Sequence, residues 1–264
     1  MSGFCVTDVS VVPFEKRNSL LVLNLKIRQD WEIDRMNVFI FLTNGTLLTL
    51  VDICQNARES MPVYQMVQRF FNWVDESEET RSVLELGSRA RSGNTNRAHF
   101  SKKHRYTGVD FMDGGNVDIV ADAHSLSDHF KPDSMDAIFA ISVFEHLAMP
   151  WKAAIEINHI MRVRSRAMFL THQTWPLHDE PFDFWRYSSD SWHAIFNQST
   201  GFKVVEAALG DEAEVTSTIQ GNATLFKDDP LCYLTSGVIV EKIGNTNLSW
   251  DVPVEQVYKG NYPH

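Results

Sequence analysis

The stretch VLELG at residues 83–87 decides the fold, because an apolar run of one strand's length stops at a glycine. Two similar runs follow, YTGVD at 106–110 and DIVAD at 118–122, and both end in an acidic residue. A glycine at a strand end lets the backbone approach a ligand. A carboxylate ending the next strand, 25 residues after Glu85, can accept hydrogen bonds from both hydroxyls of a ribose. The pattern predicts parallel strands with a nucleotide-type cofactor bound across their ends.

From residue 82 onward, short apolar stretches alternate with helical patterns. We expect strands at Val83–Leu86, Arg105–Val109, Asp118–Val120, Met135–Ile141, Ala167–Thr171, Lys203–Ala207 and Tyr233–Glu241. The clearest helix between them is expected at Trp151–Arg162. Such alternation predicts an α/β fold with a doubly wound, seven-stranded sheet and right-handed crossovers.

The residues before this region have a different character. Four β-rich runs, at 8–12, 20–27, 37–42 and 46–53, with an Asn-Gly turn signal between the last two, predict a small antiparallel β unit. A helix is expected to follow, because Ser60 can cap it, Pro62 suits its first turn and its apolar residues share one face. We therefore expect residues 1–59 to form a docking or oligomerisation unit, whose exposed edge favours a homo-oligomer, and residues 60–264 to form the main domain.

Composition narrows the function classes. The 264 residues contain 34 acidic residues against 24 Lys and Arg, giving a net charge of -10, which disfavours a nucleic-acid partner. No segment approaches the roughly 20 apolar residues of a membrane helix, and the start does not have the pattern of a secretory signal, so we expect a cytoplasmic protein without a membrane partner. Cys5, Cys54 and Cys232 lie too far apart to predict a disulfide framework or a zinc site.

Several motifs together resemble those of class I S-adenosylmethionine-dependent methyltransferases, and most closely the "type 11" group. They are ELG at 85–87, GVD at 108–110, ADA at 121–123, SVFEHL at 142–147, THQTWPLHD at 171–179 and FWRY at 184–187. The resemblance covers about Met61 to Glu241. It implies a Rossmann-like methyltransferase fold, S-adenosylmethionine as the cofactor, and methyl transfer as the activity.

The resemblance also implies which residues bind the cofactor. Glu85, Gly87 and Ser88 would lie against its methionine part, Asp110 would hold the ribose hydroxyls, Phe111 would lie against the adenine, Asp122 and Ala123 would meet the adenine amino edge, and Ser142 would line the methyl-transfer cavity. Where further glycines usually follow, this chain has Arg89 and Arg91, so the loop must run differently. Arg89 is either a partner for a carboxylate of the cofactor or acceptor, or a solvated surface residue. A nicotinamide-binding protein is an alternative that Arg89 disfavours, because it interrupts the glycine fingerprint.

Histidines are the candidate catalytic residues, because a hydroxyl acceptor must lose a proton and imidazole titrates near neutrality. We expect His172 or His178 to act as the base or to orient the acceptor, and His146 to shape the pocket through hydrogen bonds. Each could instead be a structural histidine. The acids and histidines show no recognisable ligand spacing, so no metal site is predicted.

The run WPLHDEPFDFWRY at 175–187 interleaves aromatic and polar residues, which suits a sugar ring or an amphipathic acceptor. The candidate substrate-binding residues are Glu145, Trp175, Asp179, Trp185 and Arg186. The alternatives are a lid packed on its own aromatics, and an Arg186 that pairs with Asp183 instead of binding an anionic group of the acceptor.

The resemblance, together with these histidines and aromatic residues, implies methyl transfer to a small-molecule or glycan acceptor, and we expect O-methylation of a glycan or secondary metabolite. One alternative is a non-catalytic protein of the same fold that binds cofactor and serves as a regulatory partner. Another is a binding module in which the β unit carries the function.

Overall fold

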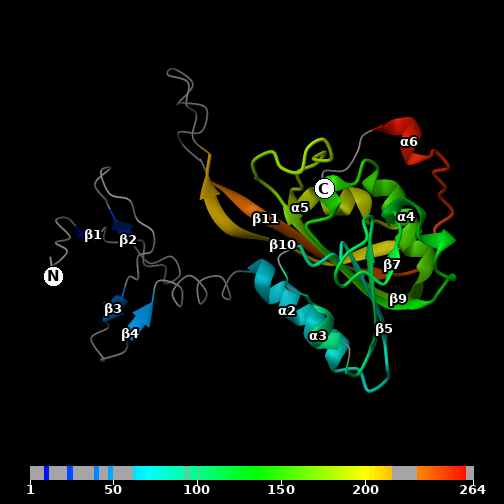
Figure 1. The fold of residues 1–264 in the computed structure, drawn as a ribbon, viewed down its shortest axis with the longest axis horizontal. Coiled ribbons are helices and arrows are strands. Elements are labelled where there is room, and N and C mark those ends of the chain that lie inside the picture. Colours follow the sequence, from blue (N-terminus) through cyan, green and yellow to red (C-terminus); the bar gives the residue numbers. More distant parts are fainter. Residues whose placement is uncertain are drawn as a thin grey trace. The chain divides into compact units, whose positions relative to one another are not determined.

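Figure 1 shows the computed structural model of the chain. The structure describes residues 62–91, 93, 95–100, 102–215 and 231–259 and, nearer the N-terminus, the backbone of four short strands. Contacts divide the chain into two units, Met1–Ser60 and Met61–His264. The role in docking or oligomerisation expected for residues 1–59 stays a prediction.

The first unit contains two separate strand pairs. Strand β1 (Val9–Val11) pairs antiparallel with β2 (Leu23–Leu25), and β3 (Phe39–Phe41) pairs antiparallel with β4 (Leu47–Thr49). Each pair forms its own two-stranded sheet. The Asn-Gly turn predicted at 44–45 lies outside the described residues, as do Cys5 and Cys54.

The second unit is built on one mixed sheet of seven strands, in the order β10-β11-β9-β8-β5-β6-β7. The strands are β5 (Ser82–Leu86), β6 (Arg105–Asp110), β7 (Ile119–Val120), β8 (Met135–Ile141), β9 (Met161–His172), β10 (Phe202–Glu214) and β11 (Leu231–Lys242). The pairs from β9 to β7 are parallel, whereas β11 runs antiparallel to both of its neighbours. The chain order reverses at β5, so the topology places the ligand crevice beyond the carboxyl ends of β5 and its neighbours.

Both faces of the sheet are covered, as the alternation of β8 shows. Its Ile138 and Ala140 belong to one apolar cluster, while Ala137 and Phe139 belong to the other, since successive side chains of a strand point to opposite faces. The first cluster packs against α4 (Pro150–Ile160), α5 (Ser189–Ile195) and the short 3-10 helices η1 (Ala123–Asp128) and η2 (Phe144–His146). The second packs against α2 (Pro62–Asp75) and α3 (Arg97–Phe100), which lie together on one side of the sheet in Figure 1.

Helix α2 follows its sequence pattern closely. Pro62 is its first residue, and its buried side chains are all apolar: Val63, Met66, Phe70, Phe71 and Val74. Because these recur every three or four positions, one face of the helix is buried on the sheet and the opposite face stays in solvent.

Several predicted bounds were wrong, among them the start of β9, which lies at Met161 and not at Ala167. The helix predicted at Trp151–Arg162 ends at Ile160, because Met161 adopts an extended backbone and begins β9 with no intervening loop. Strands β10 and β11 are longer than predicted, because each pairs with the other along nearly its whole length. Cys232 in β11 is a buried free thiol. Within the described residues, no helix combines the length and the apolarity needed to cross a membrane.

Candidate functional site

A cavity of about 610 Å³ opens at the carboxyl ends of the central strands. This volume is in the range of sites for small molecules, roughly 300–1,000 Å³. Of the residues predicted to bind cofactor, seven line it: Gly87, Arg89, Asp110, Phe111, Asp122, Ala123 and Ser142. All three predicted catalytic histidines, His146, His172 and His178, line it as well. The structure therefore brings the two predicted halves of the site to one cavity.

The turn after β5 requires a glycine. Gly87 has φ +73°, and a Cβ placed there would lie 2.3 Å from Cγ2 of Val143. Gly87 N and Ser88 N both donate to the carbonyl oxygen of Val109, at 2.8 and 3.0 Å. The loop therefore folds back over the end of β6, and the backbone itself forms part of the cavity wall.

Asp110 ties the loops after β5 and β6 together. Its Oδ2 accepts a hydrogen bond from Arg89 N at 3.1 Å, and its Oδ1 accepts one from Met112 N at 2.9 Å. A carboxylate oxygen has two lone pairs, so each can accept a further bond from a hydroxyl. This geometry fits the expected ribose role.

The two arginines of the loop have different surroundings. Arg89 is half-buried, and its Nε is buried with no hydrogen-bond partner among the described residues. Arg91 pairs with Asp179 through its two terminal guanidinium nitrogens, at 2.6 and 3.2 Å, and this pairing lowers the pKa of Asp179. The pair links the loop after β5 to the loop after β9. It occupies the carboxylate of Asp179, which was predicted to bind substrate.

Asp122 begins η1 as its N-cap. Its Oδ1 accepts a hydrogen bond from His124 N at 2.9 Å and lies 2.6 Å from His124 Nδ1. Burial alone would raise the pKa of Asp122, but the interactions with His124 outweigh it, and the pKa is lowered. His124 also lines the cavity, and no sequence motif marked it.

Glu85 and Ser88 do not line the cavity. Glu85 accepts hydrogen bonds from the Tyr106 hydroxyl and from Asn96 Nδ2, the latter at 2.8 Å, and burial raises its pKa. Ser88 Oγ donates to the carbonyl oxygen of Asn116 at 3.1 Å. Both side chains therefore support the cofactor loop, and their contact with the methionine part of a cofactor stays a prediction.

The three histidines surround one carboxylate, that of Glu145. Glu145 is completely buried, and its Oε2 accepts a hydrogen bond from the Thr171 hydroxyl. Its Oε1 lies 3.2 Å from His172 Nε2, 3.8 Å from His146 Nε2 and 4.0 Å from His178 Nε2. The residues come from η2, from the end of β9 and from the loop that follows, so only the folded chain unites them.

The Nδ1 atoms of these histidines have different surroundings, and that of His172 is buried with no hydrogen-bond partner among the described residues. His146 Nδ1 lies 2.6 Å from the carbonyl oxygen of Phe182, and His178 Nδ1 lies 3.4 Å from Asp183 Oδ2. The His172 ring stacks on Trp175, with ring centres 4.6 Å apart and planes 12° apart. Burial, together with the positive charges of neighbouring groups, lowers the pKa of His172 to about 4, so this imidazole is neutral near pH 7.

The aromatic loop is partly a self-packed unit. Arg186 pairs with Asp183 through two nitrogens, at 2.5 and 2.8 Å, which is one of the two alternatives left by the sequence. Trp185 Nε1 donates to the carbonyl oxygen of Leu147 at 2.7 Å, and neither Trp185 nor Arg186 lines the cavity. Their expected contacts with a substrate stay predictions.

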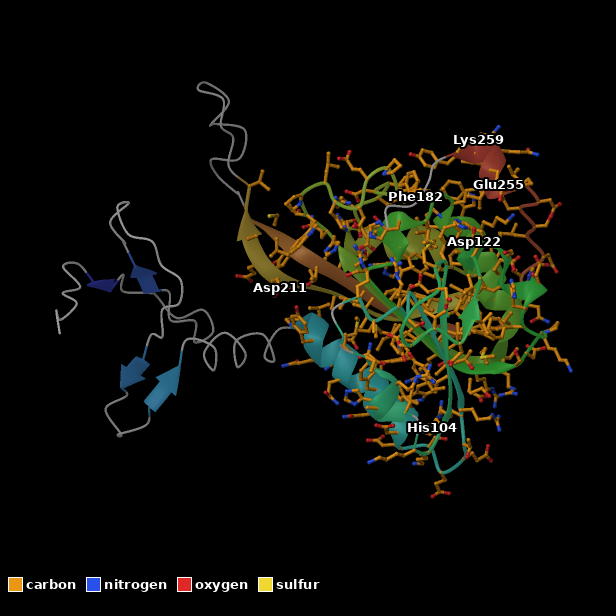
Figure 2. All side chains as sticks on the ribbon, in the orientation of Figure 1. His104, Asp122, Phe182, Asp211, Glu255 and Lys259 are labelled. Atoms are coloured by element: carbon orange, nitrogen blue, oxygen red, sulfur yellow. The ribbon has the colours of Figure 1, made fainter. Side chains whose placement is uncertain are left out.

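The C-terminal segment also forms part of the cavity wall, which the sequence did not predict. Val254 and Glu255 of α6 (Val254–Val257) line the cavity together with Tyr258. The Tyr258 hydroxyl donates to the carbonyl oxygen of Pro181 at 2.9 Å. Figure 2 labels Phe182, Glu255 and Asp122, which line the same cavity from different parts of the chain. The only local sequence feature that could have indicated this helix is Pro253, its N-cap, and the helix itself has only four residues.

Two sets of side chains here have the composition of metal ligands. Glu145, His172 and His178 form one set and His146, His178 and Asp179 form the other, and in each set the ligand atoms lie within 4.8 Å of one another. The sequence predicted no metal site, because these residues are not spaced as a recognisable ligand motif.

Comparison with known proteins identifies the domain. Residues 85–169 match the family model described as a methyltransferase domain. The match confirms the predicted resemblance to S-adenosylmethionine-dependent methyltransferases and, with it, the predicted cofactor. No curated protein matches this sequence.

Solved structures are similar to this chain. A putative methyltransferase from Bacillus halodurans superposes with a TM-score of 0.51 at 11% identity, covering 69% of this chain and 98% of that one. A SAM-dependent methyltransferase from Archaeoglobus fulgidus gives a TM-score of 0.47 at 15% identity, covering 70% of this chain and 97% of that one. The first likeness confirms the predicted Rossmann-like α/β architecture of the second unit.

Proposed function

Because residues 85–169 form a methyltransferase domain, we propose that this protein transfers a methyl group from S-adenosylmethionine to a hydroxyl of a small or medium-sized acceptor, such as a glycan or a secondary metabolite. One observation supports this proposal above all. The same cavity carries the strand-end residues Gly87 and Asp110 and also three histidines gathered around Glu145.

The residues of the cavity fit the cofactor. Gly87 brings backbone to the wall, Asp110 retains acceptor capacity for two hydroxyls, and the unpartnered Nε of Arg89 offers a buried donor to a carboxylate. When bound, the cofactor would supply a methyl group on a sulfonium sulfur, which leaves as a neutral thioether when the acceptor takes the methyl group. The main task of the protein is then to hold the acceptor close to that methyl group.

His178 is the best placed of the three histidines to take the acceptor's proton. Its Nδ1 faces Asp183 Oδ2, and Asp183 is in turn held by Arg186, so the ring is oriented by a fixed carboxylate. This arrangement leaves Nε2 to accept a proton, as in enzymes whose basic histidine is oriented by a carboxylate. His172, neutral and stacked on Trp175, would orient the acceptor.

The aromatic rings near the cavity support the proposed acceptor class. Phe182 and Tyr258 line it, and Trp175 stacks on the lining His172 with 42% of its own surface exposed. Flat aromatic faces beside polar groups suit ring compounds with hydroxyls at their rim. The altered glycine loop, whose Arg91 pairs with Asp179 of the loop after β9, is the observation on the side of the alternative, a non-catalytic regulatory partner.

The test is calorimetric titration of the whole chain with S-adenosylmethionine and with its demethylated product, with NAD as a control. We expect saturable binding of the first two and none of NAD. Asp110→Ala should weaken binding by about 1–3 kcal/mol, the scale of hydrogen bonds to a charged group, while Asp113→Ala, outside the cavity, should not.

Two results would contradict these assignments. If neither methyl donor nor product binds, the proposed activity fails. If Asp110→Ala remains folded by circular dichroism and binds with wild-type affinity, the ribose role of Asp110 is wrong.

A further inference from the structure

We propose that Glu145, His172 and His178 bind a divalent transition-metal ion, with Zn²⁺ as the representative ion. Metal binding is a property separate from methyl transfer, and it can be measured whether or not a methyl group is transferred. It rests on the position of the three side chains, on the surroundings of Glu145 Oε1 and on the surroundings of the His178 ring.

The first observation is convergence of ligand atoms. One atom from each of Glu145, His172 and His178 lies within 4.8 Å of the other two. His172 and His178 line the cavity, and Glu145 Oε1 lies 3.2 Å from His172 Nε2. Two imidazoles and one carboxylate are a recurring donor set for Zn²⁺ and for other divalent ions of the first transition row.

The second observation is an unsatisfied buried oxygen. Glu145 has no exposed surface, and its Oε1 has no hydrogen-bond partner among the described residues. Burying a carboxylate oxygen without a partner is costly, and native structures rarely do so without a reason. A cation between Oε1 and the imidazole nitrogens would satisfy this oxygen.

The third observation is the orientation of His178. Its Nδ1 lies 3.3 Å from the carbonyl oxygen of Pro176 and 3.4 Å from Asp183 Oδ2, both of which only accept hydrogen bonds. Nδ1 therefore carries the proton, and the lone pair belongs to Nε2, which lies 4.0 Å from Glu145 Oε1. Metal-binding histidines show this arrangement, in which the outer nitrogen donates to a carboxylate or carbonyl.

His146 adds a fourth candidate ligand. Its Nδ1 lies 2.6 Å from the carbonyl oxygen of Phe182, and its Nε2 lies 3.8 Å from Glu145 Oε1. The other set, with Asp179, is less suitable because both carboxylate oxygens of Asp179 already bind Arg91.

Such an ion would change the chemistry of the cavity, a consequence that rests on the proposed function. A divalent cation lowers the pKa of an oxygen acid bound to it, so it would favour loss of the acceptor's hydroxyl proton to water in the open cavity. His178 Nε2 would then hold the ion instead of receiving the proton, because both use the same lone pair.

The experiment uses the untagged full-length protein, freed of metals by a chelator and then dialysed. Zn²⁺ is added in a calorimeter, and Co²⁺ is added in parallel while its visible absorption is recorded. We expect one ion per chain in both titrations. Glu145→Gln, which keeps the shape of the side chain and removes its charge, and His178→Ala should each weaken Zn²⁺ binding by at least about tenfold.

The matched control is His193→Ala, because His193 is an exposed histidine of α5 away from the cavity. This variant should bind Zn²⁺ like the wild type. Circular dichroism checks that each variant is folded, and titration with S-adenosylmethionine tests the proposed function separately. Absence of saturable Zn²⁺ binding, or equal Zn²⁺ affinity in wild type, Glu145→Gln and His178→Ala, would overturn the proposal.

Discussion

Replacement of Gly87 by alanine tests the geometry of the cofactor loop directly. The residue has φ +73°, and the new Cβ would lie 2.3 Å from Val143 Cγ2, well inside contact distance. A left-handed backbone costs a residue with a Cβ about 1–2 kcal/mol, and forcing a methyl group into packed surroundings costs about 1–3 kcal/mol. We therefore expect Gly87→Ala to lower the free energy of unfolding by roughly 2–5 kcal/mol.

Two further variants separate these contributions. Gly93→Ala has a similar backbone, with φ +81°, but its Cβ would meet nothing within 4 Å, so it should lose only the backbone part, about 1–2 kcal/mol. Val143→Ala removes the clashing methyl group. The double variant Gly87→Ala, Val143→Ala should therefore lose less free energy of unfolding than the sum of the losses in the two single variants, by about 1–3 kcal/mol.

The assay is urea unfolding without ligand, followed by tryptophan fluorescence. The reasoning would be refuted if Gly87→Ala unfolded within about 0.5 kcal/mol of the wild type, a difference typical of neutral surface changes. Strict additivity of Gly87→Ala and Val143→Ala would show that the contact with Val143 does not cause the loss.

Two other predictions concern buried charges. Lys242 is completely buried and donates to the carbonyl oxygens of Asn158 and Met161 at 2.8 and 2.7 Å. Because Lys242→Met would leave these buried oxygens without a donor, it should lower the free energy of unfolding by about 2–4 kcal/mol. An unchanged urea midpoint would contradict this. Burial raises the pKa of Glu85 above 4.5, so the folded protein binds this proton more tightly than the unfolded chain, and the stabilisation from protonated Glu85 is lost as the pH rises above 4.5. The free energy of unfolding of the wild type relative to Glu85→Gln should therefore fall over that pH range in urea titrations. If this difference stayed constant with pH, burial would not raise the pKa of Glu85.

The local patterns predicted much of the second unit because each is decided by near neighbours in the chain. The apolar run 83–86 ends at Gly87, and Asp110 ends the next strand of the sheet, as expected for parallel strands whose carboxyl ends meet at one edge. The end of the helix at Ile160 could not be predicted, because the apolar Met161 fits the pattern of a helix as well as that of a strand. Pairing of Met161 with Met135 of β8 makes it a strand residue instead.

The sequence by itself determined the order of strands and helices, the glycine turn and the acidic strand ends, since these depend on periodicity and backbone preference over a few residues. Only the tertiary structure decided that Glu145 lies among three histidines, that Arg91 pairs with Asp179, and that Tyr258 closes on the aromatic loop. Those contacts join segments tens of residues apart, and their distances are set by the packing of η2, β9 and the C-terminal segment around one sheet edge.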